Sequence, residues 1–199
     1  MLALLHRLPF WPQPKTTDLP AIELTGERVV LRPVELCDAE DMFVFVADPQ
    51  VVHFLPWQPA SELRGVTAFL EQQRARRRSG ESLAFSVVLK ETGKVIGSTD
   101  LMQLQARSKE AELGYILAKD FWGKGLMTEA AALSRDYAFG VLQREKLLAF
   151  ADHENIGSRR VLKKIGLQEA GSEWRTVKEL SRLYIRHELT RENWEKLVH

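Results

Sequence analysis

The sequence predicts an α/β fold with a mixed sheet flanked by helices, and three stretches of the chain support this prediction. Residues 28–33 alternate between apolar and polar positions, as a half-buried strand does. Residues 83–89 and 95–101 are two apolar segments separated by a short polar turn, which is the pattern of a strand pair. Residues 113–117 are apolar like a buried strand, and apolar positions recur at helical spacing from Leu126 onward.

Length and composition predict one globular domain. The chain has 199 residues, of which 45% are hydrophobic and 28% charged. We expect residues 21–199 to form this domain and residues 1–20, which contain four prolines, to form an irregular arm. The apolar start of the arm, residues 1–5, is too short to cross a membrane, so no membrane partner is expected.

The net charge and the cysteine content indicate which partners and which cellular compartment to expect. The formal net charge of +1 gives no overall field that would attract nucleic acid, so we expect no DNA partner. The single cysteine, Cys37, excludes an internal disulfide and agrees with a reducing, cytoplasmic location. We expect this thiol to be inert packing.

Residues that typically start and end helices predict the helices of the first two thirds of the chain. Asp38 is expected to cap a helix over residues 39–47, and Ser61 a second helix with one apolar face. Four arginines within residues 74–78 close the second helix, either as a solvated last turn that complements the helix dipole or as a patch for ribosomal RNA or an acidic partner. The helix that begins at Leu126 is expected to run to about Gln143.

The last third of the chain predicts more sheet and two further helical segments. Residues 147–152 read as a buried strand, after which Asn155 opens a helix that Gly166 ends. Residues 168–177 and 183–189 are expected to be the last strands. Thr190 is a candidate cap for a terminal helical turn, which follows the last strand.

The junction between the strand at 113–117 and the following helix has the features of a phosphate cradle. Gly123 and Gly125 let backbone N–H groups approach a ligand, and the first amides of a helix lack internal partners. Lys124 adds a cation, although a lysine in such a turn equally serves solubility. The spacing fits neither the P-loop nor the dinucleotide fingerprint. Glycines that merely turn the chain remain the alternative.

Two motifs, one within residues 111–130 and the other at residues 155–166, give the chain a resemblance to a known family. The segment Phe121-Trp-Gly-Lys-Gly-Leu-Met-Thr-Glu-Ala130 is preceded by Ala111-Glu-Leu-Gly-Tyr115 and followed by Asn155-Ile-Gly-Ser-Arg-Arg-Val-Leu-Lys-Lys-Ile-Gly166. Together they resemble the GNAT superfamily of N-acetyltransferases, most closely its ribosomal-protein alanine N-acetyltransferase group, over about Glu27 to Trp194. The resemblance implies the GNAT fold, a mostly antiparallel sheet with splayed central strands.

The resemblance implies acetyl-CoA as co-substrate, with no metal. The main chain of Ile116, Leu117 and Ala118 would bind the pantetheine arm, to which the side chains of Asn155 and Ser158 would also turn. The pyrophosphate would be held by the turn made of Trp122, Gly123, Lys124, Gly125, Leu126 and Met127, with Thr128 behind it. Trp122 departs from the glutamine or arginine that is usual at its position.

The resemblance also assigns catalytic roles. Glu112 would be the general base that deprotonates the amine, while the Ser158 hydroxyl would donate a hydrogen bond to the leaving sulfur, with Asn155 beside it. The plain alternatives are a surface charge for Glu112, a helix cap for Asn155 and a first-turn residue for Ser158. Tyr115 and Tyr137 are weaker candidates for the acid.

One base position of the related enzymes is altered in this chain. Val177 stands near the place where some ribosomal-protein acetyltransferases have a proposed base, and Glu173 and Glu179 are out of register with it. The turn between the last two strands, usually Asn-Gly-like, reads Lys178-Glu-Leu-Ser181. These departures leave the acceptor open.

We expect the acceptor to be a primary amine, foremost the N-terminal α-amino group of a protein such as a ribosomal protein. Candidate acceptor contacts are Arg32, Phe54, Trp57 and Tyr115. The alternatives are a small-molecule amine, such as an aminoglycoside, polyamine or amino acid, and a non-catalytic acyl-CoA-binding module. A ribosome contact is possible on this view, and the chain would act as a monomer or homodimer.

Overall fold

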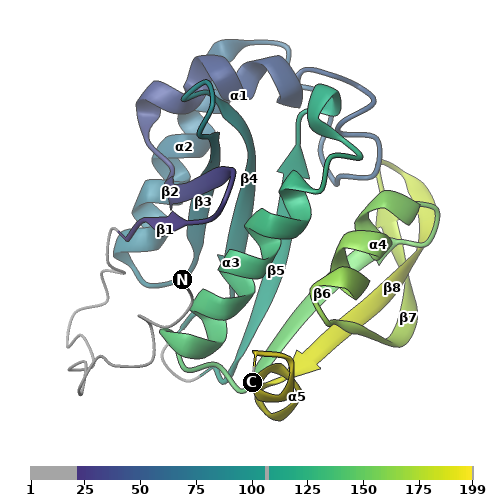
Figure 1. The fold of residues 1–199 in the computed structure, drawn as a ribbon. Coiled ribbons are helices and arrows are strands. Elements are labelled where there is room, and N and C mark those ends of the chain that lie inside the picture. Colours follow the sequence, from purple (N-terminus) through teal and green to yellow (C-terminus); the bar gives the residue numbers. More distant parts are fainter. Residues whose placement is uncertain (1–21, 106–107, 199) are drawn as a thin grey trace.

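A computed structural model describes residues 22–105 and 108–198, and its centre is one eight-stranded sheet (Figure 1). The strand order is β1-β2-β3-β4-β5-β6-β8-β7, and every neighbouring pair is antiparallel except β5 and β6. The strands are β1 Leu24–Thr25, β2 Val29–Pro33, β3 Leu83–Leu89, β4 Val95–Met102, β5 Glu110–Leu117, β6 Lys146–Asp152, β7 Gln168–Val177 and β8 Leu180–Thr190. The mixed, mostly antiparallel sheet is thus confirmed, while the expected arm at 1–20 lies outside the described residues.

Helices cover both faces of the sheet and enclose two apolar cores. The helices are α1 Ala39–Val46, α2 Leu63–Arg78, α3 Leu126–Gly140, α4 Ile156–Lys164 and α5 Arg191–Val198. The larger core lies between the sheet and α3 and α4, which both lie in front of it in Figure 1. The smaller core lies under α1 and α2 on the opposite face. Strands β3, β4 and β5 therefore send alternate side chains to the two cores.

Two of the predicted helix caps are wrong, and two end signals are confirmed. Asp38 directly precedes α1, but its carboxylate caps no N–H of that helix, because it binds Arg32, Ser86 and the Glu35 N–H instead. Helix α2 begins at Leu63, so Ser61 lies outside it. Gly166 has φ = +93° after the last turn of α4, and the Thr190 hydroxyl accepts a bond from the Asn193 N–H at the start of α5.

The turn between β7 and β8 is tighter than the sequence predicted. Val177 pairs with Leu180, so only Lys178 and Glu179 form the turn, with φ of +50° and +65°. Left-handed φ at two side-chain-bearing residues is costly, and such turns usually contain asparagine or glycine. Lys178 Nζ donates to the Val52 carbonyl, 2.8 Å away, which fastens the turn to the loop between α1 and α2.

Two further observations concern the surface. Cys37 is exposed, so the expectation that its thiol is packed is wrong. Within residues 22–105 and 108–198, none of the helices combines the length and apolar character that a bilayer span requires.

Candidate active site

The site is organised by a gap between β5 and β6. These two parallel strands pair only at Glu110–Glu112 with Lys146–Leu148, although β5 continues to Leu117 and β6 to Asp152. Beyond the paired residues the strands diverge, as Figure 1 shows. The predicted splay of the central strands is therefore confirmed, and main-chain groups on the inner edge of β5 have no strand beside them.

The alternation of β5 decides which main-chain groups face this gap. The Ala118 N–H donates to the Ile96 carbonyl of β4, at 2.8 Å. Because bonding direction alternates along an antiparallel strand, the main chain of Ile116 also turns to β4, whereas that of Tyr115 and Leu117 turns to the gap. Of the predicted trio Ile116 to Ala118, only Leu117 presents its main chain to the gap, and its carbonyl accepts a bond from Trp122 Nε1 at 2.8 Å.

The turn before α3 has the backbone geometry of an anion cradle. Gly123 and Gly125 have φ of +73° and +78°, a region that favours glycine. Gly125 is the N-cap of α3, and the first intrahelical bond runs from the Glu129 N–H to the Gly125 carbonyl. The N–H groups of the three residues between them, 126–128, precede this bond and have no partner within the helix. These amides and the helix dipole suit a diphosphate.

A residue that sequence reasoning missed fixes the cradle in place. Arg28, just before β2, donates to the Lys124 carbonyl at 2.9 Å and to the Glu129 carboxylate at 3.0 Å. Glu129 also accepts from the N–H groups of Arg28 and Val29. Burial would raise the pKa of Glu129, but these donors outweigh it and lower that pKa. The carboxylate therefore remains ionised and holds β2 to the start of α3.

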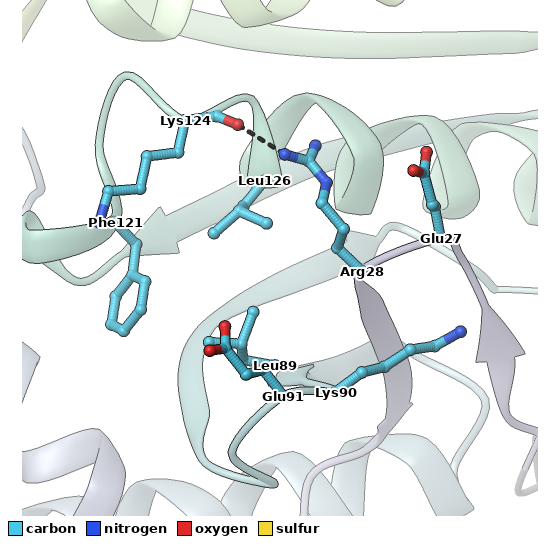
Figure 2. A pocket seen from close by; sticks show the side chains of 8 residues that line it. All are labelled: Glu27, Arg28, Leu89, Lys90, Glu91, Phe121, Lys124 and Leu126. Atoms are coloured by element: carbon cyan, nitrogen blue, oxygen red, sulfur yellow. Dashed lines mark hydrogen bonds between the residues drawn. The ribbon is translucent and has the colours of Figure 1, made fainter.

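A cavity of about 410 Å³ opens beside the cradle, between the start of β2 and the turn joining β3 to β4. Figure 2 shows its lining, in which Arg28 reaches the Lys124 carbonyl and Phe121 lies on the other side. Lys124 Nζ lies 5.5 Å from the centre of the Phe121 ring. The Lys124 ammonium is thereby held near the cradle.

The start of α4 lies across the gap from β5. Asn155 Oδ1 accepts a bond from the Ser158 N–H at 3.0 Å, which confirms the capping role of Asn155. The Asp152 carboxylate, 2% exposed, holds this helix start to β8 through Arg182 at 3.0 Å and to the Glu154 N–H at 2.9 Å. The first turn of α4 is therefore fixed by a buried ion pair that the sequence did not reveal.

Tyr115 and Ser158 meet at the gap. The Tyr115 hydroxyl donates to the Ser158 carbonyl at 3.0 Å and lies 2.9 Å from the Ser158 hydroxyl oxygen. Burial raises the pKa of Tyr115 well above its usual value, and the bond from Ser158 only partly offsets this, so the phenol stays protonated at neutral pH. Tyr137, by contrast, packs edge-on against Phe85 in the larger core, where burial raises its pKa to about 12.

Glu112 lies on the face of the sheet that α1 and α2 cover. Its Oε2 accepts a bond from Gln103 Nε2 at 2.9 Å. Burial raises the pKa of Glu112 and the charge of Glu173 adds to the rise, while Arg175 and Gln103 oppose it. A raised pKa brings a carboxylate closer to the operating pH of a general base.

Asp100 is a second acid on this face that sequence reasoning missed. It lies on β4, directly opposite Gly114 of β5. Gly114 in turn follows Glu112 by two residues along β5. Asp100 Oδ1 has no hydrogen-bond partner and no accessible surface, although part of the side chain is exposed. Burial, with a smaller contribution from the Glu112 charge, raises the pKa of Asp100 to about 6 against the opposing effect of Arg76. The signal in the sequence was a lone acid within an otherwise uncharged strand.

The predicted acceptor contacts are not gathered in one place. Arg32 is engaged by Asp38, through two bonds of 2.9 and 2.5 Å. The Phe54 carbonyl accepts from the Tyr184 hydroxyl at 3.0 Å, and the Trp57 side chain is 47% exposed. Tyr115 turns to Ser158, away from the other three.

The β7–β8 hairpin lies on the β6 side of the gap. Val177, at the altered base position, is buried. Glu173 is ion-paired with Arg175, whose guanidinium lies 3.9 Å from the centre of the Phe150 ring on β6. Glu179 is in the tight turn. Of the carboxylates considered as a base, Glu112 therefore lies on β5, the strand that borders the gap, and Asp100 lies on the next strand, β4.

Comparison with known proteins agrees with this architecture. The family model described as "Acetyltransferase (GNAT) domain" matches residues 28–168. The chain belongs to the GNAT acetyltransferase family. A related protein of Bacillus licheniformis, "Uncharacterized N-acetyltransferase p20", is 30% identical over 148 residues, which cover 74% of this chain and 83% of that protein. The protein is accordingly an acyltransferase of a family that uses acetyl-CoA.

Other GNAT relatives differ in their acceptors. Over 79 residues, 40% of this chain, it is 34% identical to the "Spermidine N(1)-acetyltransferase" of Escherichia coli K12 and 37% identical to the "Putative ribosomal N-acetyltransferase YdaF" of Bacillus subtilis, covering 42% and 43% of them. The structure of Mycobacterium smegmatis RimJ in complex with CoA-disulfide matches with a TM-score of 0.76 and 27% identity. That match covers 89% of this chain and 94% of the RimJ chain.

Proposed function

We propose that this acetyltransferase transfers the acetyl group of acetyl-CoA to a primary amine that reaches the gap from the α1 and α2 face. The observation that carries the proposal is the interruption of the β5–β6 pairing after Glu112, with the glycine cradle at the far end of β5. The gap gives a linear ligand an inner strand edge to bind. A carboxylate with a raised pKa, Glu112, lies at its closed end.

Separate groups would hold the two ends of the co-substrate. The cradle from Trp122 to Thr128 would bind the pyrophosphate through main-chain amides, and Lys124 would add a cation. The Leu117 main chain and the first turn of α4, with Asn155 and Ser158, would line the pantetheine arm. When bound, acetyl-CoA supplies the acetyl group as a thioester, which reacts with neutral amines.

The residues of the chain would then manage protons. Glu112 would accept the proton that an ammonium must lose before it can attack, a role worth roughly a hundredfold or more in rate. The hydroxyl groups of Ser158 and Tyr115, 2.9 Å apart, keep their protons at neutral pH and are placed to hydrogen-bond the sulfur side of the gap. Asn155 positions Ser158 through its cap bond.

For the acceptor we propose the N-terminal α-amino group of a protein. The similarity to RimJ over nearly the whole chain and the local similarity to YdaF support this choice. The local match to a spermidine acetyltransferase, of the same length, favours a polyamine as the second candidate. We keep a reducing cytoplasm as the expected location, because either acceptor occurs there.

The arginines of α2 give little support to a ribosome contact. Arg74 and Arg77 lie 3.5 and 3.9 Å from Glu35, and Arg76 lies 2.9 Å from Glu81. Their charge is thereby partly neutralised within the protein. A protein N-terminus that is free of the ribosome is therefore the simpler acceptor.

The primary test is thiol release from acetyl-CoA with a panel of amines. The panel contains tetrapeptides with free N-terminal alanine, serine or methionine, their N-formylated controls, spermidine, and free alanine. Turnover with a free peptide and not with its N-formyl form would support the proposal, whereas turnover with spermidine alone would select the second candidate. Binding of acetyl-CoA without turnover of any amine would contradict amine acetylation.

Glu112→Gln tests the base. The variant keeps the size and the Gln103 contact but cannot accept a proton, so we expect kcat/KM for the amine to fall roughly ten- to a thousandfold at pH 7. Part of the loss should return at high pH, where the amine deprotonates in water. The matched control is Glu110→Gln, on the same strand and face, whose carboxylate pairs with Lys146 at 3.4 Å. Equal pH profiles for wild type and Glu112→Gln would remove Glu112 from catalysis.

Gly125→Val tests the cradle. A side chain at φ = +78° strains the turn and blocks the approach of a diphosphate, so CoA affinity should fall at least tenfold in calorimetric titration. Gly93→Val, at φ = +71° in the turn between β3 and β4, is the matched control for strain alone. Loss of CoA affinity in the Gly93 variant to the same extent would show that the cradle has no special role.

A further inference from the structure

Asp100 is an acid whose position the proposed function does not explain. The larger core takes Leu101 from β4, and the Thr99 hydroxyl lies 2.7 Å from that of Ser134 on α3. The side chain of Asp100, which lies between Thr99 and Leu101 in the chain, therefore faces the other side of the sheet, beside Ala84 of the smaller core. A carboxylate on an apolar floor is costly unless it is paired, and Asp100 Oδ1 has no partner.

The neighbouring strand leaves this carboxylate uncovered. The residue opposite Asp100 on β5 is Gly114, which has no side chain to lie over it. Gly114 is also the second residue after the last β5–β6 pair, so it borders the start of the gap. Adjacent strands are about 4.8 Å apart, which puts the Asp100 carboxylate within one strand spacing of the strand that borders the gap.

Asp100 and Glu112 are diagonal neighbours on one face of the β4–β5 pair. Since Glu112 is opposite Met102, the two acids are separated as cross-strand diagonal positions are, by about 7–8 Å. Hydrogen bonds from an ammonium to a carboxylate are about 2.8 Å long. One ammonium between the two side chains can therefore contact both carboxylates.

We propose that Asp100 is a second carboxylate of the acceptor site. Asp100 and Glu112 together bind the ammonium group of the acceptor, and a carboxylate of this pair then accepts its proton. This inference rests on the proposed function and deepens it. In the step, one N–H bond of the ammonium breaks and one O–H bond forms on a carboxylate, leaving a neutral amine beside the gap. No further reactant is needed, and the paired acids favour acceptors that arrive as cations.

The charges around the pair are consistent with this role. Asp100 is faced by Arg76 of α2 and by Glu112, and Glu112 in turn by Arg175 and Glu173 of β7. Arg76 is already engaged by Glu81 at 2.9 Å. Without a bound cation, two nearby carboxylates resist ionising together, so an arriving ammonium should draw protons off the pair.

The direct test follows the carboxyl carbon of Asp100 by NMR in the full-length protein labelled with ¹³C-aspartate. The signal is assigned by its loss in Asp100→Asn, and its titration is recorded with n-butylammonium chloride or with tetramethylammonium chloride at equal ionic strength. Only the first cation can donate hydrogen bonds. We expect the butylammonium salt to move the midpoint about half a pH unit or more lower than the control salt does.

A second titration uses the coupling between the two acids. In Glu112→Gln the Asp100 midpoint should fall, because a like charge has been removed. In Glu110→Gln, whose carboxylate lies one strand repeat further from the gap, it should remain near its wild-type value. Equal Asp100 midpoints in the two salts, or no response to Glu112→Gln, would overturn the inference.

Kinetics provide a readout that a purely structural role would not move. Asp100→Asn should raise KM for the amine about tenfold with CoA affinity unchanged, and should shift the acidic limb of the pH profile. Gly114→Val, whose new Cβ meets only Met102 Cε at 3.3 Å, covers Asp100 and should raise the same KM. A folded Asp100→Asn variant with wild-type KM and pH profile would contradict the inference.

The inference and the proposed function can fail separately. If wild-type protein acetylates an amine while the Asp100 signal ignores butylammonium, the acetyl transfer stands and the role of Asp100 is refuted. If the signal responds to butylammonium but no amine is acetylated, the acidic pair binds amines and the proposed transfer is refuted.

Discussion

Two shielded aspartates on the same side of the sheet differ in almost every contact. The Asp38 carboxylate, 2% exposed, accepts bonds from Arg32, from the Ser86 hydroxyl at 2.6 Å and from the Glu35 N–H at 2.9 Å. Asp100 Oδ1 accepts none. Burial would raise the pKa of both, but the donors around Asp38 reverse the effect and lower its pKa, whereas the pKa of Asp100 rises to about 6.

This difference separates a structural charge from a reactive one. Asp38 is satisfied by residues of β2 and β3, and its charge is part of what holds α1 to the sheet. Asp100, on β4 and so nearer the gap than β2 and β3, is left with unused hydrogen-bonding capacity. Proteins retain such costly groups where function needs them, so the least satisfied acid marks the site better than the most buried one.

The largest expected change in stability comes from Asp38→Asn. An amide cannot neutralise Arg32, so the free energy of unfolding at pH 7 should fall by about 2–4 kcal/mol. Because the folded pKa of Asp38 lies below its ordinary 3.8, its contribution is complete above that pH and is lost as the pH falls through the folded value. Urea unfolding at pH 7 and pH 3 is the measurement. A loss of equal size at both pH values would mean that the charge of Asp38 is irrelevant.

Asp100→Asn should have the opposite sign. The folded pKa of about 6 exceeds the ordinary 3.8, so ionised Asp100 destabilises the protein at pH 7, and the penalty disappears as the pH falls below 3.8. We expect the variant to be more stable than wild type by about 1–3 kcal/mol at pH 7 and equal to it near pH 3.5. Urea unfolding at the two pH values measures this. A destabilised variant at pH 7 would make Asp100 a structural residue like Asp38.

Ser86→Ala should have the smallest effect. It removes one of the donors to Asp38 and leaves Arg32 and the Glu35 N–H, so stability at pH 7 should fall by about 1 kcal/mol. Ser98→Ala is the matched control, because Ser98 is the cross-strand partner of Ser86 on β4. Equal unfolding midpoints for the two variants would show that Asp38 does not depend on the Ser86 hydroxyl.

The sequence was sufficient for most of the elements and for the motifs that are contiguous in it, although it did not predict β1 and placed the end of α3 at Gln143 instead of Gly140. Strand β3 and strand β7 have the predicted bounds, and the cradle glycines have the left-handed φ that their role requires. Such signals depend on neighbours a few residues apart, as does the Asn155 cap. The β5–β6 splay came from the resemblance to the family, not from the residues themselves.

Features that depend on distant pairing could not be predicted. Arg28 and Glu129 are 101 residues apart, and nothing local in either shows that they meet. The Asp38 cap failed because Ser86, 48 residues away, competes for the same carboxylate. Asp100 became a site residue only when strand register put Gly114 opposite it. Lys178 and Glu179 form a tight turn without a glycine because the Val52 carbonyl, 126 residues earlier, helps to hold Lys178.

The early end of the β5–β6 pairing has a consequence for how the protein behaves when empty. Unpaired strand edges normally lie at the margins of a sheet, where proteins protect them because another chain can add to them. Here an edge occurs in the middle of the sheet, along Leu113–Leu117, and a ligand lying there takes the place of a missing strand. Solubility and thermal resistance should therefore follow the supply of co-substrate, since any ligand that binds only the folded chain stabilises it in proportion to the logarithm of its concentration. A cell short of acetyl-CoA and CoA would hold this enzyme in its most aggregation-prone form.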